Sequence, residues 1–276
     1  MLDAHCHLNS TRLEAEPESL LAEARAAGVT GIVMAGVDST CWSTQLDLVK
    51  RFPTHVFPVF GLHPQVIPSL NDAEIRSELS TLRDLIARHR PVALGETGLD
   101  ALSPETRSCL DVQKSVFRQQ LAIARETELP VVLHLLRAEA HALAILKADG
   151  VPKRGGVVHS FSGSADFALA LVRLGLHVSF CGTLTLPQSR RLREAAVAVP
   201  LERILIETDS PDQTPWAAGQ APDGSRLTHT PPNRPAWLPE IAAALADARG
   251  LTVESVAEAT EANTRALFGL PREEAL

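Results

Sequence analysis

The sequence contains no tyrosine and few aromatic residues of any kind. Its 276 residues include eight phenylalanines and three tryptophans, so aromatic residues make up 4% of the chain. Proteins that hold single-stranded nucleic acid by base stacking use several aromatic side chains along a groove. The composition therefore argues against a binding surface built from rows of stacking aromatics.

Basic residues are in the minority. The chain has 26 lysines and arginines against 33 aspartates and glutamates, which gives a formal net charge of −7. Surfaces that coat nucleic acid broadly are basic, so this charge argues against such a surface. It remains compatible with an enzyme that grips a few phosphates through metal ions.

Cysteines and long apolar runs are scarce as well. The four cysteines, Cys6, Cys41, Cys109 and Cys181, lie far apart and form no Cys-x-x-Cys pair, so neither a disulfide framework nor a structural zinc knuckle is expected. A cytoplasmic location fits these cysteines and the lack of a signal-peptide pattern. The longest apolar runs are too short to cross a bilayer. We expect no membrane partner, and no obligate protein partner is evident.

What the sequence does contain is a regular alternation of short apolar runs with helical patterns. The continuous hydrophobicity of the runs is typical of strands buried on both faces. Eight such strands are expected, at Leu2–Leu8, Gly31–Val37, Val56–Leu62, Val92–Glu96, Leu129–His134, Gly156–His159, His177–Gly182 and Arg203–Asp209.

This alternation predicts the α/β class and, within it, a (β/α)8 TIM barrel, for which about 250 residues are typical. We expect a single domain over residues 1–276. The main rival is a doubly wound open sheet, which the absence of a glycine-rich loop after the first strand disfavours. Asp72 is expected to cap the helix that reaches about Arg88, and a polar connection is expected after Asp100. The segment Pro211–Pro235 is rich in proline, glycine and polar residues and predicts a long surface loop.

Polar residues that can ligate metals stand at or near the ends of several of these strands. His5 and His7 project from the same face of the first strand, and further candidates are Glu96, His134, His159 and Asp209. The carboxyl ends of barrel strands meet at one rim. There, four imidazoles and two carboxylates can hold two divalent ions about 3.5–4 Å apart, with Glu96 as the bridge. Each residue alone could have a structural role or be solvated, but six such residues, all at strand ends, are hard to explain by chance.

The motifs around these residues resemble those of the TatD family of metal-dependent deoxyribonucleases, within the amidohydrolase-type barrels. The resemblance covers essentially the whole chain and is carried by Asp3–His7, Gly61–Pro64, Gly95–Asp100, His134, His159–Gly163, Glu207–Pro211 and Asn263–Phe268.

The resemblance implies a barrel and a metal-dependent phosphodiesterase that acts on DNA, as an exonuclease, with two divalent ions as cofactors. One ion would take His5, His7, Glu96 and Asp209, and the other Glu96, His134 and His159. The His-rich set suits Zn or Mn, and the carboxylates accept Mg. Asp209 would be the general base, and Glu96 would be catalytic through its place between the two ions.

The sequence also departs from the family pattern. The family usually has Ser-Arg after the fifth-strand histidine, whereas this chain has Leu135-Leu136, with Arg137 one place later. Arg137, Arg234 and His63 are the candidate substrate-binding residues. The alternatives are an exposed loop position for Arg234 and a structural role for His63.

Three function classes remain after this reading. The leading hypothesis is a deoxyribonuclease that uses a metal-activated water and the Asp209 base. The second is an amidohydrolase or lactonase that applies the same metals to the carbonyl of a small molecule. The third, a non-enzymatic metal-binding scaffold, is weakest, because an open two-metal site provides a reactive water with no other purpose.

Overall fold

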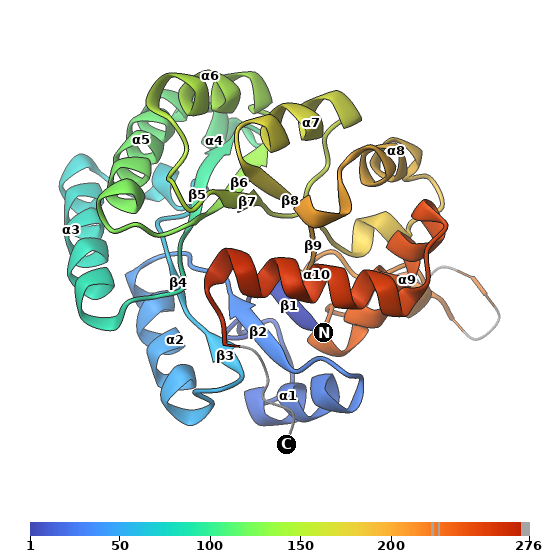
Figure 1. Cartoon of the computed structure of the whole chain (residues 1–276). Coiled ribbons are helices and arrows are strands. Elements are labelled where there is room, and N and C mark those ends of the chain that lie inside the picture. Colours follow the sequence, from blue (N-terminus) through green and yellow to red (C-terminus); the bar gives the residue numbers. More distant parts are fainter. Residues whose placement is uncertain (222–223, 226, 272–276) are drawn as a thin grey trace.

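A ring of parallel strands forms the centre of the molecule, and helices surround it (Figure 1). The computed structural model describes residues 1–221, 224–225 and 227–271. Its strands are β1 (Leu2–Cys6), β2 (Gly31–Met34), β3 (Val56–Phe57), β4 (Val59–Phe60), β5 (Ala93–Asp100), β6 (Val131–Leu136), β7 (Gly156–Val158), β8 (Leu176–Phe180) and β9 (Ile204–Ile206).

Helices follow most of the strands and form the outer layer. They are α1 (Pro17–Ala26), α2 (Ser39–Arg51), α3 (Asp72–His89), α4 (Pro104–Ser108), α5 (Leu110–Glu126), α6 (Glu139–Asp149), α7 (Ala165–Arg173), α8 (Arg190–Ala198), α9 (Leu238–Arg249) and α10 (Val253–Phe268). No described helix is long and apolar enough to cross a membrane.

The strands close into a ring through backbone hydrogen bonds. They form a three-stranded sheet, β1-β2-β3, and a six-stranded sheet, β4 to β9, in which all pairs are parallel. Beyond β9, the Asp209 amide donates to the His5 carbonyl at 3.0 Å, and the His7 amide donates to the Ser210 carbonyl at 2.8 Å. At the second junction between the two sheets, the Glu96 amide donates to the Gly36 carbonyl at 2.9 Å. The predicted barrel is confirmed.

The third predicted strand, Val56–Leu62, is wrong in one respect: the structure divides it into β3 and β4, which belong to different sheets. Pro58 stands between them, and proline has no amide hydrogen for a sheet ladder. Gln45 of α2 spans the division, since its side chain donates to the Ala35 carbonyl at 2.7 Å and accepts from the Val59 amide at 3.0 Å.

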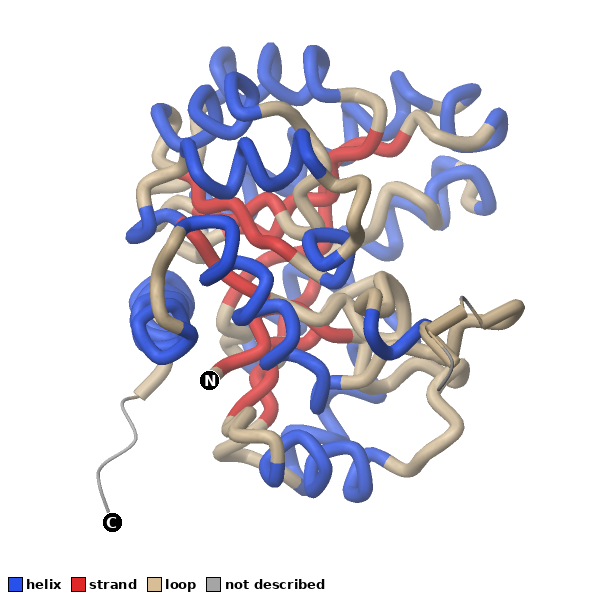
Figure 2. The backbone as a smooth tube through the Cα atoms, turned by 90° about the vertical axis from the view of Figure 1, so that its right-hand side faces the viewer, coloured by secondary structure: helices blue, strands red, loops and turns tan. Residues whose placement is uncertain are grey.

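The barrel interior is filled by small and branched side chains, with almost every strand contributing. This layer includes Leu2, Ala4, Val33, Val59, Ala93, Val132, Val157 and Leu205, and three residues at the end of the chain, Leu267, Phe268 and Leu270, pack against it. Helix α10 thus covers the end where the strands begin (Figures 1 and 2). Figure 2 shows α10 at the left and long connections at the opposite, right-hand end.

Three local predictions need correction. The fourth predicted strand does not end at Glu96, because β5 continues to Asp100 by pairing with β6. The cap of α3 is Asn71 rather than Asp72, since the Asn71 side chain accepts from the amides of Ala73 and Glu74. The connection after Asp100 contains the short helix α4, which begins after a Ser103 cap.

The predicted surface loop Pro211–Pro235 is more firmly attached than its composition suggested. Residues 222, 223 and 226 lie outside the described part of it. Asn233 is fully buried, its side-chain amide donates to the Thr208 carbonyl at 2.7 Å, and its own carbonyl accepts from the Ser210 hydroxyl at 2.6 Å. The returning end of the loop is therefore fastened beside the segment that closes the ring.

Replacing Asn233 should destabilise the protein. Asn233→Ala leaves the buried Thr208 carbonyl without this donor, so we expect the free energy of unfolding to fall by about 2 kcal/mol in urea titrations. The exposed Gln119→Ala on α5 is the matched control and should change it by less than about 0.5 kcal/mol. Equal stability of the two variants would show that Asn233 does not fasten the loop.

Candidate metal centre

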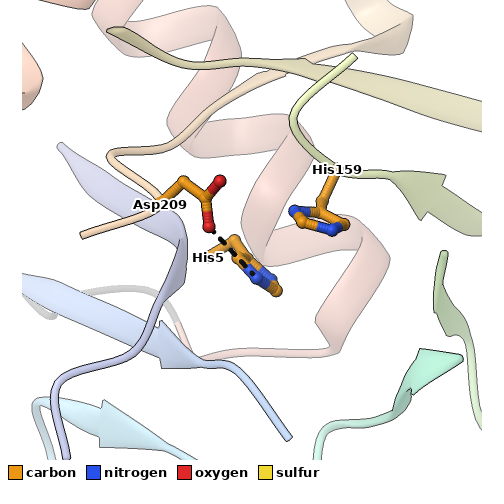
Figure 3. Close-up of side chains that lie close together, drawn as sticks. All are labelled: His5, His159 and Asp209. Carbon is orange, nitrogen blue, oxygen red and sulfur yellow. Dashed lines mark ion pairs between the residues drawn. The ribbon is translucent and has the colours of Figure 1, made fainter. Parts of the chain in front are cut away.

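Six side chains meet at the end of the barrel opposite α10. His5 lies in β1 and His7 just after it, Glu96 lies within β5, His134 lies in β6, and His159 and Asp209 follow β7 and β9. We refer to these six residues as the donor cluster. Figure 3 shows His5, His159 and Asp209 pointing toward one another from three separate segments. The sequence prediction that these residues come together at one rim therefore agrees with the geometry.

Glu96 lies at the centre of the cluster, and each of its two oxygens faces a different group. Oε1 lies 3.5 Å from Nε2 of His5 and 3.4 Å from Nε2 of His7. Oε2 lies 2.8 Å from Nε2 of His159 and 3.7 Å from Nδ1 of His134. Nε2 of His63 also lies 3.2 Å from Oε2, so His63 joins the second group.

Asp209 completes the first group. Its Oδ1 lies 3.8 Å from Nε2 of His5 and 3.6 Å from Nε2 of His7. The potential ligand atoms of His5, His7 and Glu96 lie within 4.8 Å of one another, as do those of His63, Glu96 and His134. The carboxylate of Glu96 thus faces two sets of potential ligands, and these sets adjoin, because the ligand atoms of His5, His159 and Asp209 also lie within 4.8 Å of one another.

The chemistry of these groups fits divalent metal ions. Nitrogen and oxygen donors about 2.0–2.1 Å from a tetrahedral ion lie about 3.3–3.4 Å from one another, close to most of the separations measured here. Both ring nitrogens of His5 and Oε1 of Glu96 are buried and have no hydrogen-bond partner within the described residues. Leaving such atoms unpaired is unfavourable, and ligation of a metal would satisfy Nε2 of His5 and Oε1 of Glu96, which face each other.

Two further carboxylates face the outer ring nitrogens of the histidines of the second group, and one of them, Asp100, is within hydrogen-bond distance. Oδ2 of Asp100 lies 3.1 Å from Nε2 of His134, the ring nitrogen that faces away from Glu96. Oε1 of Glu207 lies 3.6 Å from Nδ1 of His159 and accepts a hydrogen bond from the Ser160 amide. A carboxylate on the outer nitrogen fixes the orientation of an imidazole and makes it a better ligand.

Electrostatics keeps the buried carboxylates charged. Burial by itself raises the pKa of Glu96, but His63, His159 and His5 hold it well below its usual value. Burial also raises the pKa of Asp209, and the hydrogen bond with His7 and the neighbouring histidines outweigh this effect and lower it. Burial lowers the pKa of His63 to about 4, which leaves that imidazole neutral at pH 7.

A hollow of about 600 Å³ opens onto the cluster. Its walls include His7, His63, Glu96, His134, His159 and Asp209 together with Arg12, Val37, Gln65, Val66, Leu136, Asp212 and Gln213. This volume lies within the range of about 300–1,000 Å³ that is usual for ligand pockets. Leu136 shares a face of β6 with His134, two residues away, and gives the hollow an apolar wall.

The structure places Arg137 and Arg234 away from this hollow. Arg137 is exposed and lines a separate depression with Arg107 and His141. The guanidinium of Arg234 donates to Glu23 of α1 at 2.9 Å and lies over the ring of Trp237. Their role in substrate binding stays a prediction, whereas His63 lies inside the hollow.

Sequence reasoning missed several contributors to the site. Glu207 belongs to the Glu207–Pro211 motif, but no role was inferred for it from the sequence. Its carboxylate, two residues before Asp209, was the feature that could have indicated a place in the site. Arg12 and Asp212 line the hollow from the segments that follow β1 and β9. No periodicity marks either residue, and only the folded chain brings the two segments together.

Comparison with known proteins identifies similar chains over nearly the full length. A family model described as TatD related DNase matches residues 2–269. The metal-dependent hydrolase YabD of Bacillus subtilis is 31% identical over 268 residues, which cover 97% of this chain and 98% of that protein. The 3′-5′ ssDNA/RNA exonuclease TatD of Pantoea vagans is 33% identical over 275 residues, covering 98% of this chain and all of the relative, 100%.

A solved structure shares the architecture. The crystal structure of YJJV, a TATD homolog from Escherichia coli K12, has a TM-score of 0.87 and 30% sequence identity, and the match covers 98% of each chain.

Metal content should respond selectively to the loss of one histidine. We expect the metal-free protein to take up about two zinc or manganese ions per chain and His134→Ala to take up about one, because only the group on Oε2 of Glu96 loses a donor. Elemental analysis after gel filtration measures this. His89→Ala, at the exposed end of α3, is the matched control. Two ions retained in His134→Ala would remove His134 from the ligands.

Proposed function

Since the chain belongs to the TatD-related DNase family and is a metal-dependent hydrolase, we propose that it is a deoxyribonuclease that hydrolyses the phosphodiester bonds of DNA from accessible ends. The observation that carries the proposal is the buried Glu96 carboxylate, which offers one oxygen to each of two donor groups at the floor of an open hollow. A shared carboxylate of this kind is typical of two-metal sites for phosphoryl chemistry.

In this proposal the donor cluster holds two divalent ions. His5, His7, Glu96 and Asp209 are the ligands of the first, and Glu96, His134 and His159 are those of the second. Imidazole and carboxylate donors suit Zn or Mn, and Mg is a further candidate. Ions bound here supply a water of lowered pKa and positive charge beside a phosphate oxygen.

The protein residues perform the remaining tasks. Asp209 lines the hollow and remains ionised at neutral pH, so its carboxylate accepts the proton of the attacking water. Asp100 holds the ring of His134 in place, and Glu207 lies 3.6 Å from the outer nitrogen of His159. His63 is neutral and lines the same hollow, where we expect it to contact the substrate; its Nδ1 accepts from the Gln65 amide and its Nε2 lies 3.2 Å from Oε2 of Glu96.

Support for nucleic acid as the substrate comes from the relatives. The Pantoea vagans protein is a 3′-5′ ssDNA/RNA exonuclease, and this chain matches its entire length. The net charge of −7 favours weak binding and turnover at accessible ends or single strands over tight binding to internal duplex sites. Carbonyl hydrolysis of a small ester or lactone by the same metals is the alternative outcome of the test.

The deciding experiment compares substrate classes on one preparation. Metal-reconstituted protein is incubated with DNA labelled at the 5′ or the 3′ end, single- and double-stranded, with matching RNA, and with a panel of small esters and lactones. Progressive shortening of DNA from one end supports the proposal. Turnover of a lactone or ester while DNA stays intact would replace it with the amidohydrolase or lactonase alternative.

Replacing Asp209 tests the mechanism. Asp209→Asn keeps the shape and one acceptor oxygen but removes the basic group, and a positioned base contributes roughly 10²- to 10⁴-fold to the rate. We expect kcat to fall by at least that range while the melting temperature changes little. Exposed Asp47→Asn on α2 is the control. A near-wild-type kcat in Asp209→Asn would exclude Asp209 as the base.

A further inference from the structure

A second hollow adjoins the one above the donor cluster. Its volume is about 430 Å³, and its walls include Thr183, Leu186, Pro211, Thr214, Thr230, Pro231 and Pro232. Arg12, Asp212 and Gln213 line both hollows. The boundary between the two is therefore made by the segment after β1 and the segment after β9, which also carry His7 and Asp209 of the cluster.

The boundary is an ion pair between Arg12 and Asp212. Nη1 of Arg12 donates to Oδ1 of Asp212 at 2.8 Å, and Nη2 donates to the other carboxylate oxygen, so the pair is bidentate. Both residues are held close to the cluster: the Asp212 amide donates to the Asp209 carbonyl at 2.8 Å, and a turn joins His7 to Ser10, two residues before Arg12.

Arg12 can leave this ion pair for another partner at little cost in stability. The side chains of Arg12 and Asp212 are 60% and 47% exposed, and exposed ion pairs contribute only about 0–1 kcal/mol. A phosphate offers the same planar guanidinium a bidentate and charge-assisted contact. Little stability is lost when Arg12 leaves Asp212 for a phosphate group.

Arg12 also differs in its permanent positive charge from the other described residues of the two hollows. Among the described residues that line the two hollows, it is the one arginine or lysine. The wall that includes Val37, Val66 and Leu136 offers apolar surface, and the remaining charged groups are the donor cluster and Asp212. Among the described residues of the two hollows, the permanently positive partner for a second negative charge of the substrate is therefore Arg12.

We propose that the second hollow is the subsite for the nucleotide adjacent to the phosphodiester that is cleaved. In this proposal Arg12 releases Asp212 and binds the phosphodiester that leads into the subsite. This inference rests on the proposed nuclease function and narrows its substrate to strands with at least two phosphodiesters. Asp212 is then a competitor that holds Arg12 in place until the strand arrives.

The first test measures binding without metal and without turnover. A fluorescent single-stranded oligonucleotide is titrated with metal-free protein at several salt concentrations, and its anisotropy gives the dissociation constant. One phosphate contact contributes about 0.7 to the slope of log K against log salt for single strands. Arg12→Gln should lower the slope by about 0.7 and weaken binding about tenfold at low salt.

The matched control is Arg83→Gln, which removes an equally exposed arginine that pairs with Glu126 on the outer helices α3 and α5. It should leave the slope and the affinity unchanged. Asp212→Asn removes the competitor and should strengthen binding several-fold. An unchanged slope in Arg12→Gln, or an equal loss in Arg83→Gln, would overturn the subsite.

The second test uses substrates of different length with the metal-loaded protein. A trinucleotide carries a second phosphodiester, whereas the p-nitrophenyl ester of thymidine 5′-phosphate carries one. Arg12→Gln should lower the ratio of kcat/KM for the trinucleotide to that for the ester by about tenfold, through KM. An equal effect on both substrates would place Arg12 at the cleaved bond and overturn the subsite. If neither phosphodiester is cleaved, the proposed function fails, and the salt slope still decides whether Arg12 binds phosphate.

Discussion

The arrangement of the barrel end depends on a carboxylate that is buried where water cannot solvate it. Glu96 is 1% exposed, and an isolated charge in such a place is strongly unfavourable unless it is paired. Imidazoles from four other segments surround its two oxygens. The backbone has to come very close for this to happen: a Cβ on Gly36 or Gly61 would lie 2.1 Å or 2.5 Å from backbone atoms of Gly95. Glycine at these positions is therefore part of how Glu96 is held.

The barrel and the meeting of the donor cluster could be predicted from sequence because both follow from one repeated pattern. Apolar runs that alternate with helical periodicity predict parallel strands, and parallel strands in a ring direct their carboxyl ends to the same rim. Residues such as His134 and Asp209, placed at the ends of such runs, then have to meet. Local patterns and a single topological rule are enough to predict this meeting, and the motifs of a known family support it further.

What could not be predicted depends on contacts between segments that are distant in sequence. The division of a strand at Pro58 shows this, because Gln45 on α2 supplies the missing backbone partners. Gln120 on α5 does the same for Leu62, whose amide and carbonyl it binds at 2.8 Å and 2.9 Å. A glutamine on an amphipathic helix looks like any surface residue in the sequence. The pairing of Arg12 with Asp212, 200 positions apart, is hidden for the same reason.

The hydrogen bonds between His5 and Asp209 and between His7 and Ser210 also bear on how the protein is made in the cell. The first and last strands of the ring meet there, so the ring cannot close until the chain has been synthesised past residue 210. A growing chain on the ribosome folds from its N-terminal part onward, but in this molecule the first group around Glu96 lacks Asp209 until that late stage. A chain that ends before Asp209 thus carries an incomplete donor cluster. Any chemistry that needs all six of these residues has to wait until the chain has been made past that point.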